Sequence, residues 1–564
     1  MLLLAQTTIP DLPSDRPNFP GLPLPTPEQN LKPLEPLPDE PLPELPPADE
    51  ILPLPSPSLP GEQTGEGPAT VTVTGYKVEG STVFDAQELA KITAPFLGEV
   101  TFSDLLQARS AVTKLYVDRG YVTSGAFIPP QTLDSGIVTI QVLEGKLEDV
   151  RINGSQRLHP HYVRTRLARA GAEPLNVQVL LEGLKLLQLD PLLSSISADL
   201  QAGIEPGTSL LDVTVTEADP FRATLAIDNG RSPSVGSIRR KVSFSHANVL
   251  GIGDGFDLSY SNTEGSNALD LSYSVPLNAR NGSLRFAYGR TRSRVLEDPF
   301  QPLDIQAKSI YYEGTYRQPL YQTASEEFAL GLTFSRQESS TKLGFSDIGG
   351  FPLSPGANEN GETKISALRF FQEWNKRSSQ QVLAARSQLS LGTNWFESNQ
   401  SSDGGPDSNF LTWRGQGQWV RLLAPETLML VRGDLQFADR DLVPLEQFGI
   451  GGQSSVRGYR QDSLLTDNGL LLSAEVRLPI ARIPSWDAVL QVAPFFDLGH
   501  GWNKDGNNQP DKKTLTGTGL GLIWRQGNNF SARLDWGIPL VDVGNENDTL
   551  QEKGIYFSVN YNPF

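Results

Sequence analysis

The sequence contains no cysteine, only four histidines and no long apolar run. Without cysteine the chain has no disulfide, no thiolate nucleophile and no thiolate metal ligand. Two of the histidines, His159 and His161, flank Pro160 at the start of a predicted helix, and we expect no metal there. Because no run of about 18 apolar residues occurs, the sequence predicts no transmembrane helix.

The chain also lacks positive charge and the common catalytic motifs. Its net charge is −18 and its pI is near 4.8, which argues against a nucleic acid as partner. No P-loop, GxSxG or HExxH motif occurs, so we expect no enzymatic activity, no cofactor and no catalytic residue. With 564 residues the chain exceeds one soluble core of ordinary size.

Residues 1–69 are rich in proline and acidic side chains. They hold 19 of the 43 prolines, and eleven acidic residues against Arg16 and Lys32. Dense proline prevents helix and sheet formation and favours extended chain, so we expect a disordered spacer that does not pack. The first residues, MLLLAQTT, suggest the end of a truncated signal peptide, with a chance leucine cluster as the alternative.

A repeated pattern follows the spacer. In residues 70–146 the alternating strand VTVTGYKVEG precedes two segments with helical spacing and two further extended segments. Residues 147–219 show the same order of strand, helix, helix, strand, strand. The sequence therefore predicts two small α+β domains, each with two helices on one face of a small sheet.

Residues 220–564 alternate between apolar and polar positions without helical spacing. In ALDLSYSVPL, Leu269 and Leu271 lie on the face opposite Asp270 and Ser272. The second face is too polar for a dry β-sandwich or propeller, whereas a wet interior and an apolar exterior are what a transmembrane β-barrel requires. The length allows about 16 antiparallel strands at roughly 10 residues per tilted strand plus turns.

The end of the chain has the same alternation. In GIYFSVNYNPF, Ile555 to Tyr561 alternate outward and Phe564 is the last residue. This resembles the signal that the outer-membrane barrel-assembly machinery reads, although Pro563 disturbs the register. A soluble adhesin is disfavoured by this strand.

Together these features resemble a known family. The segments YVTSGAFIPPQ (121–131), SVRGY (455–459) and FFDLGHGW (495–502), in this order after two repeats, resemble the two-partner secretion transporters of the TpsB type, the haemolysin secretion/activation proteins with POTRA domains. The resemblance covers about residues 70–564. It implies periplasmic POTRA domains at 70–146 and 147–219 and an outer-membrane barrel at 220–564.

The resemblance also implies a functional site. In the family a long sixth extracellular loop folds back into the barrel, and its arginine meets acidic residues on the wall. Carried to this chain, the tip comprises Val456, Arg457, Gly458 and Tyr459, and the wall partners are Asp497 and Glu475. Strand alternation independently points both carboxylates into the lumen, less securely for Asp497 because Pro494 lies in its strand. The alternative is that they are merely solvated.

The implied activity is secretion of one large TpsA-type exoprotein in unfolded form. The POTRA domains would capture it, and sheet-edge addition is one way to bind an extended chain without demanding one sequence. Outer-membrane lipid and the barrel-assembly machinery are further expected partners. An insertase of the same superfamily is the closest alternative, although insertases usually carry three or more POTRA repeats; a porin would lack them. Some members plug the barrel with an N-terminal helix, which this proline content disfavours.

Overall fold

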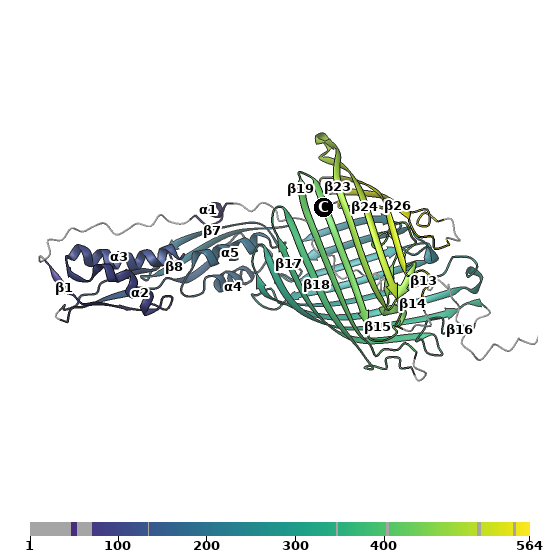
Figure 1. Cartoon of the computed structure of the whole chain (residues 1–564), viewed down its shortest axis with the longest axis horizontal. Coiled ribbons are helices and arrows are strands. Elements are labelled where there is room, and N and C mark those ends of the chain that lie inside the picture. Colours follow the sequence, from purple (N-terminus) through teal and green to yellow (C-terminus); the bar gives the residue numbers. More distant parts are fainter. Residues whose placement is uncertain are drawn as a thin grey trace, which may run out of the picture.

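The computed structural model describes residues 47–53, 70–133, 135–345, 348–401, 405–504, 509–544 and 549–563. Two small α/β units lead into one large barrel, so the molecule is elongated (Figure 1). Among the residues described, no helix combines the length and apolarity needed to cross a bilayer.

The first α/β unit has a three-stranded sheet in the order β2-β5-β4. Its elements are β2 (Gly75–Glu79), α2 (Ala86–Thr93), α3 (Phe102–Asp118), β4 (Gly125–Phe127) and β5 (Ile137–Leu143), with a separate pair formed by β1 (Val71–Val73) and β3 (Gly98–Val100). The core lies between helices and sheet, where Val112 and Tyr116 of α3 pack on Ile140 of β5. The predicted order of elements is present.

The second unit repeats this arrangement with sheet order β6-β8-β7. It consists of β6 (Lys146–Asn153), α4 (Pro160–Ala170), α5 (Val177–Gln188), β7 (Leu193–Ala202) and β8 (Thr208–Glu217). The outer strands again pair with the central one in opposite senses, β6 parallel and β7 antiparallel to β8. His159 caps α4, its Nδ1 accepting from His161 N at 3.2 Å.

A half-buried carboxylate stabilises the equivalent turn in both units. Glu144 accepts hydrogen bonds from the Thr82 and Val83 amides, and Glu217 accepts from the amides of residues 156–158 at 2.7–2.9 Å. Burial alone would raise the pKa of the Glu217 carboxyl, but these donors outweigh it and lower that pKa to about 2. The repeat thus extends to individual side chains.

The barrel is closed and has 16 strands when the two-residue β16 (Gly349–Gly350) is left out. The strands are β9 (Phe221–Asp228), β10 (Arg239–Ala247), β11 (Gly255–Asn262), β12 (Ser266–Pro276), β13 (Ser283–Arg294), β14 (Ile305–Gln322), β15 (Glu326–Leu343), β17 (Glu362–Arg377), β18 (Gln381–Thr393), β19 (Leu411–Ala424), β20 (Thr427–Ala438), β23 (Asn468–Ile483), β24 (Ala488–Trp502), β25 (Thr514–Gln526), β26 (Phe530–Pro539) and β27 (Ile555–Tyr561). All pair antiparallel, and β27 closes the barrel on β9, so no edge remains. The predicted fold class is confirmed. Phe564 lies outside the described residues.

The faces of the strands follow the predicted alternation. Leu472 and Phe496 are each 47% exposed on the outer face, whereas Glu475 and Asp497, at odd spacing from them, are 7% and 0% exposed. Pro494 leaves β24 in register with β25, because it pairs with Leu520 within an unbroken run. The uncertainty about the orientation of Asp497 is therefore removed.

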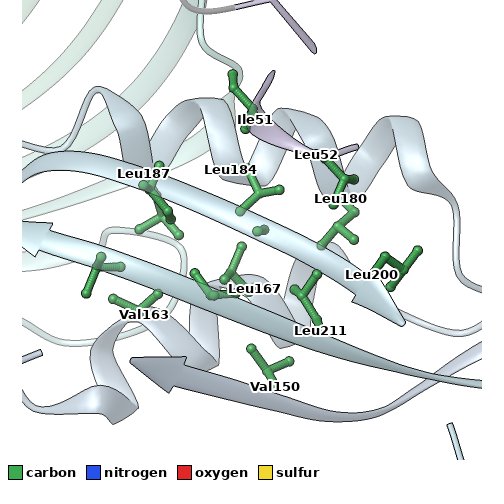
Figure 2. Packing of buried hydrophobic residues seen from close by; sticks show 14 of the residues in the cluster. Ile51, Leu52, Val150, Val163, Leu167, Leu180, Leu184, Leu187, Leu200 and Leu211 are labelled. Carbon is green, nitrogen blue, oxygen red and sulfur yellow. The ribbon is translucent and has the colours of Figure 1, made fainter. Parts of the chain in front are cut away.

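The expectation that residues 1–69 remain unpacked is wrong for residues 47–53. Residues Ala48–Ile51 form a short helix, α1, and Ile51 and Leu52 are 1% and 3% exposed. They join the core of the second unit beside Leu180 and Leu184 (Figure 2). Burying two adjacent aliphatic side chains releases enough free energy for the segment to dock there, although prolines flank it. The rest of the spacer lies outside the described residues.

Candidate functional site

The loop between β20 and β23, residues 439–467, folds into the barrel. Within it, β21 (Phe448–Ile450) pairs with β22 (Leu464–Thr466) to form a small hairpin. Phe448, Ile450, Val456 and Tyr459 are buried together with Leu515 of β25, which belongs to the wall. This apolar cluster holds the glycine-rich tip against strands β23–β27.

Arg457 is the centre of the tip. Its Nε and Nη2 donate to the two oxygens of Asp497 at 2.7 and 2.9 Å, and its Nη1 donates to Glu475 at 2.7 Å. The guanidinium carbon lies 3.4 Å from the centroid of the Phe495 ring. The planar fork thus uses both hydrogen-bonding edges and one face, which a lysine could not do.

The ion pairs of Arg457 belong to a larger cluster in which arginines and carboxylates are equal in number. Arg533 bridges Glu475 and Asp535, with the closest contact to each at 2.6 Å. Arg477 reaches Glu475 at 2.9 Å. Three arginines, at positions 457, 477 and 533, therefore face three carboxylates, at positions 475, 497 and 535. Because the arginines and carboxylates are equal in number, the cluster adds no net charge to a site largely shielded from water.

The residues beside Arg457 fit the tip to the wall. Gly458 has φ +107°, and a Cβ there would lie 2.9 Å from Pro539 N. The Tyr459 hydroxyl donates to Thr516 O at 2.9 Å and accepts from Val541 N at 3.0 Å. The Tyr556 hydroxyl accepts from Gly458 N and donates to Tyr459 O. Only glycine tolerates this backbone at so close an approach.

Further ion pairs, made by Glu446 and Arg460, hold the same loop. Glu446, at the loop's beginning, accepts from both terminal nitrogens of Arg369 on β17, at 2.6 and 3.0 Å. Arg460, just beyond the tip, donates to both oxygens of Glu297 in the loop after β13, at 2.9 and 3.0 Å. The loop is therefore attached to the wall at its beginning and its tip, and to a neighbouring loop.

The structure brings together all six residues that the sequence singled out. Sequence reasoning missed the other charged residues, namely Arg369, Glu446, Arg460, Glu297, Arg477, Arg533 and Asp535. Alternation in FSARLDWG places Arg533 and Asp535 on the polar face, which was the available signal. Within the described part of the chain, no group of three or more histidine, aspartate or glutamate side chains is placed to hold a metal ion.

Comparison with known proteins agrees with this geometry. A model of the haemolysin secretion/activation proteins ShlB/FhaC/HecB matches residues 207–523, and a model of the ShlB-type POTRA domain matches residues 71–145. The chain belongs to this haemolysin secretion/activation family. It is accordingly an outer-membrane transporter of the two-partner secretion type, with a β-barrel in the outer membrane and POTRA domains in the periplasm.

Several relatives match over most of their length. The outer membrane transporter CdiB of Escherichia coli is 25% identical over 492 residues, covering 84% of this chain and 80% of the relative. The heme/hemopexin transporter protein HuxB of Haemophilus influenzae is 24% identical over 473 residues, 80% of each chain.

Solved structures share the fold. The structure of CdiB from Escherichia coli has a TM-score of 0.66 at 21% identity, covering 90% of this chain and 93% of that one. BamA from Haemophilus ducreyi, lacking POTRA domains 1–3, has a TM-score of 0.51 at 15% identity, covering 87% of this chain and 100% of that one.

Proposed function

We propose that this transporter captures one exoprotein in unfolded form through its POTRA domains and threads it through the barrel when the Arg457 loop yields. In this proposal residues 70–146 and 147–219 are the capture domains and 220–564 the channel. The observation that carries it is the loop tip, which occupies the barrel interior through contacts of Arg457 with Asp497 and Glu475. Because side chains make the contacts between this tip and the barrel wall, the tip can move without unpairing a strand of the barrel.

The energy for threading would come from the exoprotein. The proposal requires neither nucleotide nor catalytic chemistry, because folding of the exoprotein outside the cell supplies direction. Capture would use the free edges of β4 and β7, where main-chain hydrogen bonds give affinity without demanding one sequence. Surrounding lipid, and the barrel-assembly machinery during biogenesis, are the other proposed partners; nucleic acid is not one.

The alternative is insertion of other barrels into the outer membrane. Its support is the likeness to BamA, which at 15% identity concerns the fold alone. The test is deletion of the gene followed by analysis of the culture medium and of the outer membrane. Transport predicts that one large protein disappears from the medium while other barrels keep their abundance. A general loss of folded barrels with secretion intact would overturn the proposal in favour of insertion.

A further inference from the structure

The docked segment 47–53 marks a surface of the second POTRA unit that the transport mechanism does not use. The segment contacts α5 and β7, and its two aliphatic side chains lie over Leu180 and Leu184 (Figure 2). Its backbone hydrogen bonds from Glu50 N and Ile51 N end on Pro47 O, within its own turn. The attachment that the described residues show is the burial of the Ile51 and Leu52 side chains.

The apolar surface under the docked pair, here named the α5–β7 groove, is made of leucine side chains. Leu180, Leu184 and Leu187 come from one face of α5, and Leu200 comes from β7, the edge strand of the sheet. Glu50 and Pro53, on either side of the docked pair, are exposed. The groove thus binds a pair of adjacent aliphatic residues, and the residues on either side of that pair stay exposed to water.

We propose that the α5–β7 groove is a peptide-binding site for paired aliphatic residues, that residues 47–53 are its resident ligand, and that aliphatic segments of the arriving exoprotein displace them. The docking stands on its own contacts, whereas the displacement rests on the capture function proposed above. Unfolded exported chains expose such pairs, and folded ones bury them. The groove would therefore bind an unfolded exoprotein in preference to a folded one.

The covalent linkage sets the strength of this competition. Residues 54–69 connect the docked segment to the first POTRA unit, and a short tether gives an effective concentration in the millimolar range. An exoprotein segment that binds the groove as tightly as residues 47–53 must reach a similar local concentration to displace them. An exoprotein already bound at a neighbouring sheet edge reaches that local concentration, so displacement of residues 47–53 follows capture.

The absence of native cysteine permits a direct test in the full chain. A Leu52→Cys chain in detergent is reacted with a maleimide, and a Pro53→Cys chain serves as the exposed control, since Leu52 is 3% exposed and Pro53 is exposed. Docking predicts labelling of Leu52→Cys at least tenfold slower than that of Pro53→Cys. Adding Ile51→Asp to Leu52→Cys should remove the difference. Equal rates in the two single variants would overturn the docking.

Displacement is tested with a synthetic peptide of residues 44–58 at millimolar concentration. The peptide should accelerate labelling of Leu52→Cys several-fold and leave Pro53→Cys unchanged, whereas a peptide with aspartate in place of both Ile51 and Leu52 should do nothing. Slow labelling that the peptide does not alter would overturn displacement. Because secretion is not measured, either failure is distinguishable from failure of the transport proposal.

Discussion

Arg457 stabilises the loop through contacts that cannot be replaced one at a time. It meets Asp497 at two atoms and Glu475 at one, in a site where Asp497 is 0% exposed. Removing one member of a buried ion pair leaves the other charge unpaired, which costs about 3–5 kcal/mol. Water in the lumen reduces that figure. Arg533 and Arg477 then remain to compensate Glu475, but Asp497 loses its arginine.

The glycine beside Arg457 allows a sharper test of the tip geometry. Gly458→Ala should displace the tip, at a cost of about 1–3 kcal/mol, because φ is +107° and the new Cβ would lie 2.9 Å from Pro539 N. Trypsin cleavage after Arg460 in outer-membrane fractions should then become faster. Gly417→Ala is the matched control, since a Cβ there meets nothing within 4 Å. Unchanged cleavage of Gly458→Ala would show that the tip tolerates the strain.

Glu217 supplies a pH-dependent contribution to the second POTRA unit. Its pKa in the folded chain is lowered to about 2 from the ordinary value of 4.5, so the ionised form stabilises the fold. That stability is fully present above about pH 4.5 and is lost as the pH falls towards 2.

Glu217→Gln should therefore accelerate hydrogen exchange of the amides of α4 and α5 at pH 7 and flatten the change below pH 4.5. The exposed Glu205→Gln is the control and should leave exchange unaltered. A variant at position 217 that keeps the normal acid profile would contradict the assignment of this turn to Glu217.

At the scale of elements, strand alternation was enough to predict the barrel and the direction of its carboxylates. A period of two identifies the face on which Glu475 or Asp497 lies, and the structure agrees. Alternation does not give the position of a side chain along the barrel axis relative to side chains on other strands, because that position depends on the register between strands. Hence the sequence could not say that Arg533 of β26 reaches Glu475 of β23.

The docked segment could not be predicted for a different reason. Ile51 and Leu52 are one aliphatic pair in a proline-rich stretch, with no periodicity to read. Their burial depends on a groove built from residues more than a hundred positions later, such as Leu180 and Leu184. Composition alone therefore predicted a disordered spacer and missed the short segment that packs on an apolar surface.

The spacer should nevertheless be dispensable for barrel formation. The described part of it contacts α5 and β7 of the second POTRA unit, and strands β9 to β27 close on one another. Deletion of residues 10–60 should leave heat-modifiable mobility of the chain in outer-membrane fractions unchanged. Loss of the folded form would mean that the spacer takes part in assembly.

At the scale of the whole molecule, the proposed function assigns different roles to the closed barrel wall and to the loop inside it. The wall satisfies its backbone groups by strand pairing, which leaves the loop free to respond to other contacts. An exoprotein can shift the loop only by interacting differently with its docked and released positions.

The central claim is that the Arg457–Asp497 contact holds the loop in a secretion-competent position, which is the docked position from which the loop yields to the arriving exoprotein. It is tested most directly by a double-mutant cycle, with exoprotein in the medium and barrel heat-modifiability measured for Arg457→Ala, Asp497→Ala and the double variant. We predict that each single change lowers secretion at least tenfold with the barrel folded, and that the double variant is little worse than either, because both remove one interaction. Strictly additive losses, or normal secretion by Arg457→Ala, would contradict the claim.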